Sequence, residues 1–260
     1  MHRPSERRIL SRRAALLTGV AATAGLATVG GVVTALSLGR RWLAAHPEPA
    51  PTAALRLGAT PLSCVVTPAL AEGPYFVDER LERSDIRTDT ATGVTVPGTP
   101  LEVELLVARV AGSSCTPLAS AIVDLWQCDA TGRYAGVSDP GGSTRGSTFL
   151  RGYQRTDEQG LVRFLTIFPG WYRGRAVHIH CKVRTDPTAG RGYEFTSQLF
   201  FDDVLIDQVH AQPPYAARGQ RDTRNAADSI FRQSRGQTIV PLVPSGNGYA
   251  GTFAVGIRLA

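Results

Sequence analysis

Short stretches in which apolar and polar residues alternate recur along the chain from residue 101 onward. Alternation at every second position is typical of β-strands, because successive side chains point to opposite faces of a sheet. The clearest case places Phe253, Val255, Ile257 and Leu259 on one face. The pattern predicts six strands, over residues 101–110, 121–128, 161–168, 178–183, 197–201 and 252–259.

Clusters of Gly, Pro, Asp and Ser separate these stretches, as expected for turns. One short helix is predicted over residues 225–235, with Gly236 in the capping position at its end. Many strands with little helix between them favour two packed sheets over a parallel α/β sheet. The predicted fold class is therefore all-β, an antiparallel β-sandwich with at most one or two short helices and no second domain.

The first 46 residues differ from the rest of the chain. They hold seven arginines against one glutamate, and an apolar run extends from Ala14 to Leu38. Basic residues ahead of an apolar run are typical of an export signal, and Ser11-Arg12-Arg13 with the residues after it resembles a twin-arginine signal. Retention as a membrane anchor is the alternative, since about 25 uncharged residues suffice to span a bilayer.

We therefore divide the chain into a signal or anchor segment (1–46), a linker (47–63) and one domain (64–260). We expect export to the cell envelope or beyond by the twin-arginine route, with contact to a membrane only through residues 14–38 if they are not cleaved. The whole net charge of +6 belongs to residues 1–46, and the remainder is balanced. Nucleic acid is therefore not an expected partner.

Four cysteines are present, and three full pairings are open to them. Cys64 and Cys115 each lie in a loop-like stretch ahead of a strand, so this disulfide is the first to expect in an exported protein. Cys128 and Cys181 fall in predicted strands, where small buried side chains are expected. No C-x-x-C spacing occurs, which argues against a structural zinc site.

Histidine is scarce, and beyond residue 46 only His178, His180 and His210 occur. Because side chains alternate along a strand, His178 and His180 emerge on one face while Ile179 and Cys181 point to the other. Two adjacent neutral nitrogen donors are what a metal site requires, although two half-exposed histidines on a sheet face are the simpler alternative. His210 has no motif partner and is interpreted as structural or superficial.

Two tyrosines follow turns near the predicted histidine strand. Pro169-Gly170 marks a turn, so Tyr172 and Arg175 lie in the loop that leads to the histidines. Tyr134 closes a second turn, after the strand at 121–128. A lone tyrosine at such a place is more often an amphipathic residue at the rim of a sandwich.

Four separated stretches carry a resemblance to a known family. They are EGPYF, VDLWQCDATGRY, PGWYRGRAVHIHCKV and SQLFFDD, within residues 64–203. Together they resemble the intradiol ring-cleavage dioxygenases, in particular an exported catechol- or protocatechuate-dioxygenase-like branch that lacks a helical N-terminal dimerisation segment. The resemblance implies a β-sandwich, in agreement with the strand pattern.

The resemblance further implies that Tyr134, Tyr172, His178 and His180 are ligands of a non-haem iron(III). A ferric ion is hard and highly charged, so it lowers the pKa of a phenol and holds the deprotonated oxygen. Zinc more often takes histidine, cysteine and carboxylate, and ferrous oxygenases use two histidines with one carboxylate. The tyrosine pair is therefore the discriminating feature.

The implied reaction is cleavage of a catechol-type aromatic diol by O₂ to a muconate-type diacid. The resemblance assigns Tyr172 a proton-accepting role and Arg175 the stabilisation of charge developing on the substrate ring. Gln198 is expected to orient the substrate, and Tyr75 to line the pocket. Asp124 and Trp126 are interpreted as scaffold.

Other classes stay open at this point. One is a metal-free β-sandwich that acts as a binding module at the cell surface, and another is a zinc or copper site at the two histidines. A serine hydrolase is disfavoured, because no G-x-S-x-G elbow occurs. The sequence does not distinguish among catechol, chlorocatechol, hydroxyquinol and protocatechuate, and it leaves a homo-oligomer open.

Overall fold

The computed structural model of the chain describes residues 64–139, 141–185 and 192–259. The predicted signal or anchor segment (1–46, with its apolar run 14–38) and the linker (47–63) lie outside the described residues, so this division stays a prediction. Within the described part, no helix is both long and apolar enough to cross a membrane.

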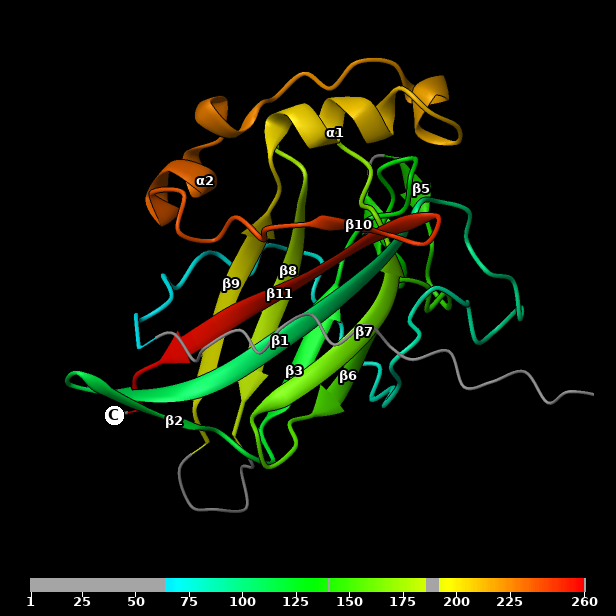
Figure 1. Cartoon of the computed structure of the whole chain (residues 1–260). Coiled ribbons are helices and arrows are strands. Elements are labelled where there is room, and N and C mark those ends of the chain that lie inside the picture. Colours follow the sequence, from blue (N-terminus) through cyan, green and yellow to red (C-terminus); the bar gives the residue numbers. More distant parts are fainter. Residues whose placement is uncertain (1–63, 140, 186–191, 260) are drawn as a thin grey trace, which may run out of the picture. The chain divides into compact units, whose positions relative to one another are not determined.

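Two β-sheets dominate the domain (Figure 1). The first contains β1 (Pro100–Ala111), β2 (Ser114–Pro117), β7 (Leu161–Ile167), β10 (Val243–Ser245) and β11 (Gly248–Ile257). The second, in the order β6-β3-β8-β9, contains β6 (Arg151–Arg155), β3 (Ile122–Trp126), β8 (His178–Arg184) and β9 (Glu194–Phe200). A small separate pair is formed by β4 (Ser138–Asp139) and β5 (Gly142–Ser143). The all-β sandwich class is confirmed, and all six predicted strands are present with shifted ends.

The prediction that the strands are antiparallel is wrong for one pair. β1 and β11 run parallel, with Leu101 opposite Tyr249 and Arg109 opposite Ile257. A parallel pair cannot be joined by a tight turn and needs a long connection. Here the connection runs through most of the domain, because β1 is the first strand along the described chain and β11 is the last.

The core lies between the two sheets and is built from the inward residues of each strand. Val123, Leu125, Ile179, Cys181 and Val183 of the second sheet are fully or almost fully buried against residues such as Leu105 and Val255 of the first. Cys181 and Cys128 are free and buried, as predicted for small core side chains. This leaves the opposite face of the second sheet free to carry polar groups.

Two short α-helices, α1 (Asp203–His210) and α2 (Ser229–Ser234), lie at the end of the sandwich where β8 begins and β9 ends (Figure 1). The helix predicted over 225–235 divides into the 3₁₀ turn η3 (Asn225–Ala227) and α2, and its left-handed cap is Arg235, one residue before Gly236. A second 3₁₀ turn, η2, spans Tyr215–Arg218.

The sequence pattern missed α1. Its signals are the Asp202 carboxylate, which accepts from the backbone N–H groups of Val204 and Leu205, and an apolar face at Ile206 and Val209.

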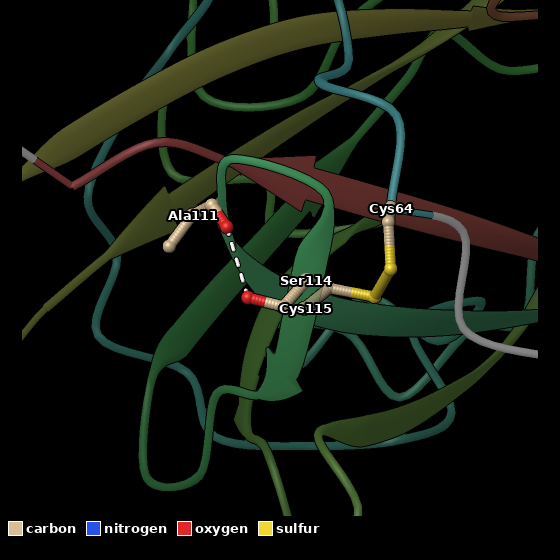
Figure 2. Close-up of a disulfide and its surroundings, with 4 residues drawn as sticks. All are labelled: Cys64, Ala111, Ser114 and Cys115. Carbon is tan, nitrogen blue, oxygen red and sulfur yellow. Dashed lines mark hydrogen bonds between the residues drawn. A yellow bond between two sulfur atoms is a disulfide. The ribbon is translucent and has the colours of Figure 1, made fainter.

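The expected disulfide joins Cys64 to Cys115 (Figure 2). Cys115 lies in the short strand β2 rather than in a loop, because β2 pairs with the end of β1 through Val110 opposite Cys115. The bond fixes the first described residues to the five-stranded sheet. From there the chain adds to β11, where Thr67 donates its N–H to the carbonyl of Gly256.

Replacing both disulfide cysteines by serine is expected to lower the free energy of unfolding by about 4 kcal/mol, because the bond closes a loop of 51 residues in the unfolded chain. Equilibrium unfolding in urea of the Cys64→Ser/Cys115→Ser variant and of the wild type would measure the difference. Since both cysteines belong to the edge of the sheet opposite β8, activity of the folded variant should be unchanged. An unchanged unfolding free energy would contradict a structural role for the bond.

Candidate functional site

The outer face of the second sheet carries a row of polar and aromatic side chains across all four strands. The strand registers place Arg151 of β6 opposite Trp126 of β3, Trp126 opposite His180 of β8, and His180 opposite Gln198 of β9. The Trp126 and His180 rings stack with centroids 4.8 Å apart. Trp126, interpreted from sequence as scaffold, therefore forms one wall of the site, while Asp124 pairs with Arg184 as a scaffold residue would.

Four side-chain atoms that can donate an electron pair to a metal ion lie close together at the first residues of β8. The Nε2 atoms of His178 and His180 lie 3.0 Å apart, and the hydroxyl oxygens of Tyr172 and Tyr134 lie 3.3 and 3.5 Å from Nε2 of His178. Nδ1 of His178 is 2.6 Å from the carbonyl oxygen of Ala176 and donates its proton there, so Nε2 presents a lone pair. The structure thus brings together all four residues that the sequence nominated.

Close backbone contact holds the two tyrosine turns together. In the turn that carries Tyr134, Asp129 accepts hydrogen bonds from the N–H groups of Thr131 and Arg133, and Gly132 adopts a φ of 84°. A Cβ atom at Gly132 would overlap the carbonyl oxygen of Trp171, and one at Gly170 would overlap that of Asp129. Only glycine allows this approach, which brings Tyr134 and Tyr172 to one place.

The loop that carries Tyr172 is also held by residues of α1 and of the 3₁₀ turn η2. Arg218 donates to the carbonyl of Trp171, and the indole N–H of Trp171 donates to the carbonyl of Gly219. His210 contacts the carbonyl oxygen of Pro169 through Nε2 at 3.0 Å and stacks on Tyr215. His210 is therefore structural, as its lack of a motif partner suggested, and it supports the loop from behind.

Arg175 reaches the donor cluster from the end of the same loop. Its Nη1 is 3.4 Å from the hydroxyl of Tyr172, and its Nη2 donates to Oε1 of Gln198 at 2.5 Å. Its Nε donates to the carboxylate of Asp228 at 2.8 Å. Gln198 in turn donates from Nε2 to the carbonyl of Ala71, which fixes the orientation of its amide.

Tyr75 lies on the other side of the cluster. Its ring stacks on that of Tyr134 with centroids 4.5 Å apart. The buried Arg151 side chain donates to the carbonyl oxygens of Tyr75, Val77 and Ala135, and so ties the Tyr75 and Tyr134 segments to the sheet. Burial lowers the pKa of Arg151 to about 10, although Glu79 and Tyr134 oppose this shift.

Burial sets the protonation of all four donors. It raises the pKa of Tyr172 to about 12 against the opposing charge of Arg175, and raises that of Tyr134 well above the usual value, with a further contribution from Tyr172. It lowers the pKa of His178 to about 3 and that of His180 well below the usual range, with Arg175 and His178 respectively adding to the effect. Without a metal, the cluster is uncharged at neutral pH.

This donor set fits a hard, highly charged metal ion. One imidazole lone pair, on Nε2 of His178, faces three other polar atoms within 3.5 Å, more than a single acceptor can satisfy. A cation among the four atoms would engage each of them, and it would offset the burial that keeps the two phenols protonated. Among the described residues, no group of three or more His, Cys, Asp or Glu side chains is placed to hold a metal ion, so a metal held here would need the tyrosine oxygens as well as the two histidines.

Sequence reasoning missed Asp228 and Arg151. Asp228 precedes Ser229-Ile230-Phe231, a signal for a helix N-cap, but nothing in the sequence connects it to Arg175. Arg151 is one of 28 basic residues and stands in no recognisable motif.

Comparisons with known proteins agree with the fold. The family model for dioxygenases (Dioxygenase_C) matches residues 71–209, more than half of the chain. The intradiol ring-cleavage dioxygenase from Tetranychus urticae has a similar structure, with 30% identity, a TM-score of 0.64, and coverage of 75% of this chain and 95% of that one. The dioxygenase domain of a dioxygenase and carbohydrate-binding fusion from Streptomyces sp. SirexAA-E is 31% identical, with a TM-score of 0.52 and coverage of 75% and 100%.

A curated relative is the protocatechuate 3,4-dioxygenase beta chain of Burkholderia cepacia, 32% identical over 144 residues. That match covers 51% of this chain and 60% of the relative. The fold of this chain is thus shared with a class of dioxygenases. The chain belongs to the intradiol ring-cleavage dioxygenase family.

The metal-free protein is expected to lose stability as the pH falls below about 6.5. The unfolded chain protonates His178 near that pH, whereas the folded protein does so only near 3. The stability is therefore fully present above the unfolded pKa and is lost towards the folded one, by roughly 2 kcal/mol between pH 6.5 and 4.5 for His178. Urea unfolding of the metal-free wild type and of His178→Gln over this range isolates the contribution, and equal pH slopes would contradict it.

Proposed function

We propose that this protein is a non-haem iron(III) enzyme that cleaves a catechol-type aromatic diol between its two hydroxyl-bearing carbons. Both atoms of O₂ would enter the product, a muconate-type diacid. The observation that carries the proposal is the convergence of two phenol oxygens and two imidazole nitrogens at the start of β8. Membership of the intradiol family supports it.

Tyr134, Tyr172, His178 and His180 would hold the iron. When bound, a ferric ion would supply Lewis acidity that favours the phenolate form of the diol and makes its ring reactive toward O₂. The two imidazoles are neutral and His178 is already oriented by the carbonyl of Ala176, so these ligands need no proton loss before binding.

Tyr172 is the ligand best placed to hold a proton that the diol gives up. Its side chain is partly exposed, whereas Tyr134 is 1% exposed and enclosed by Trp126, Tyr75 and Cys128. The pKa of the Tyr172 phenol, raised to about 12 by burial, favours the protonated form once the oxygen is free. Nη1 of Arg175 lies 3.4 Å from that oxygen. The guanidinium can therefore stabilise negative charge on the Tyr172 oxygen or on the diol.

Gln198 and Tyr75 complete the surroundings. Gln198 fixes Nη2 of Arg175 and is itself fixed by the carbonyl of Ala71, so the guanidinium is held before substrate arrives. Tyr75 adds an aromatic face beside Tyr134, where a flat substrate ring can pack.

Export is proposed together with this function. The disulfide between Cys64 and Cys115 supports it, because such bonds persist in oxidising compartments. A twin-arginine route carries folded proteins and would allow the metal to be loaded beforehand.

Replacing Arg12 and Arg13 by lysine should retain the protein in the cytoplasm, as cell fractionation would show, and unchanged export would contradict this route.

The purified protein is expected to contain stoichiometric iron and to show a broad tyrosinate-to-iron(III) absorption band in the visible. Adding catechol without oxygen should shift the band to longer wavelength, because the diol displaces a ligand oxygen. Admitting ¹⁸O₂ should then place both labelled atoms in the ring-opened product. A colourless, iron-free protein that ferric reconstitution leaves colourless and inactive would overturn the proposal in favour of a metal-free binding module.

Phenylalanine substitutions test the two tyrosines separately. Tyr134→Phe and Tyr172→Phe should each weaken the visible band and lower kcat/KM by roughly 100-fold or more. The loss of a residue that only hydrogen-bonds to a metal ligand already costs about 10–100-fold, and loss of a ligand should cost at least as much. Tyr153→Phe is the matched control, because its exposed hydroxyl contacts Glu82 at 3.3 Å and does not belong to the cluster. Equal spectra and rates for all three variants would exclude the tyrosines as ligands.

A further inference from the structure

The buried carboxylate of Asp228 contacts Arg175, the cation that reaches the donor cluster. The side chain is 1% exposed, and one of its oxygens, Oδ2, accepts from Nε of Arg175 and from the backbone N–H of Ala176, both at 2.8 Å. The other, Oδ1, accepts from the N–H groups of Ile230 and Phe231 at 2.7 and 3.0 Å. Both carboxylate oxygens are thus saturated by donors.

Arg175 has a hydrogen-bond partner at each of its three side-chain nitrogens, and Asp228 is one of the three partners. Nε is held by Asp228, Nη2 by Gln198, and Nη1 is left facing the hydroxyl of Tyr172 at 3.4 Å. A guanidinium on a long side chain loses much rotamer freedom when it is ordered, and here that ordering is complete in the folded protein.

Asp228 is also linked to a histidine of the cluster through one residue, Ala176. It holds the N–H of Ala176, and the carbonyl of Ala176 receives the Nδ1 proton of His178. The N-cap of α2 anchors the carboxylate itself, so α2 is tied to both the cation and the imidazole. Burial alone would raise the pKa of Asp228, but hydrogen bonds from Phe231, Ala176 and Arg175 lower it, and the carboxylate stays ionised.

We propose that Asp228 is a positioning residue for the reaction, acting through Arg175. The inference rests on the proposed function, since Arg175 has a task only if negative charge develops on a bound substrate. Asp228 touches none of the four donor residues directly, and its effect is to hold the guanidinium where that charge appears.

The Asp228→Asn variant tests the inference. The amide oxygen can still cap α2, but its NH₂ group meets the N–H donors of Arg175 and Ala176 and cannot accept from them. We expect kcat to fall roughly 10- to 100-fold with a smaller change in KM, while iron content and the visible band without substrate stay as in the wild type. Asp228→Ser, which keeps a capping oxygen but is too short to reach Arg175, should behave alike.

Asp202→Asn is the matched control. Asp202 caps α1 with the same pair of backbone bonds but contacts no arginine, so kcat should be unchanged. A comparable fall in kcat for Asp202→Asn would show that exchanging any helix-capping carboxylate for an amide, rather than losing the Arg175 contact, is responsible, and would overturn the inference.

A double-variant comparison separates positioning from general support. If Asp228 acts through Arg175, adding Asp228→Asn to Arg175→Gln should cause no further loss of kcat. The inference would be overturned if the two losses of kcat multiplied in the double variant, or if a folded Asp228→Asn protein kept the wild-type kcat. An iron-loaded wild type without ring-cleaving activity would instead overturn the proposed function, so the two failures are distinguishable.

Discussion

The alternation of side chains along β8 is the constraint on which the rest of the domain depends. Ile179, Cys181 and Val183 fill the core, and His178 and His180 stand on the opposite face. A shift of one residue in the pairing of β8 would exchange these two sets and place imidazoles in the core. The register is set by buried pairs on both sides, Leu125 with Cys181 and Cys181 with Ser197, so the hydrophobic core itself aims the histidines.

The tyrosines depend on a different kind of order. Neither lies on a strand, and both are positioned by turns whose backbones touch through Gly132 and Gly170. Behind the second turn stands a segment from far along the chain, which supplies His210, Arg218 and Asp228. The sheet therefore provides the nitrogen donors, while the turns provide the oxygen donors and the cation, a common division between scaffold and loops.

The strands and the histidine face follow from local periodicity, which is why residue patterns alone predicted them. The tyrosines, Arg175 and Gln198 could be nominated only through family resemblance, because their meeting is a matter of tertiary contact. The parallel pairing of β1 with β11 and the role of Asp228 could not be predicted, since each joins positions remote in sequence and neither leaves a periodic signal. Helix α1 was within reach, because Asp202 and the spacing of Ile206 and Val209 follow the rules for a capped amphipathic helix.

The pairing of β1 with β11 also shapes how the domain is made. The Thr252 hydroxyl of β11 donates to the Glu104 carboxylate of β1, and the two residues are 148 positions apart in the sequence. Strand β1 can therefore complete its pairing only after β11 has been synthesised. A nascent chain therefore holds β1 with one open edge for most of its translation, and the final sheet forms only when distant segments meet. Such high contact order makes for slow folding and a long period in which unpaired strands need protection from one another.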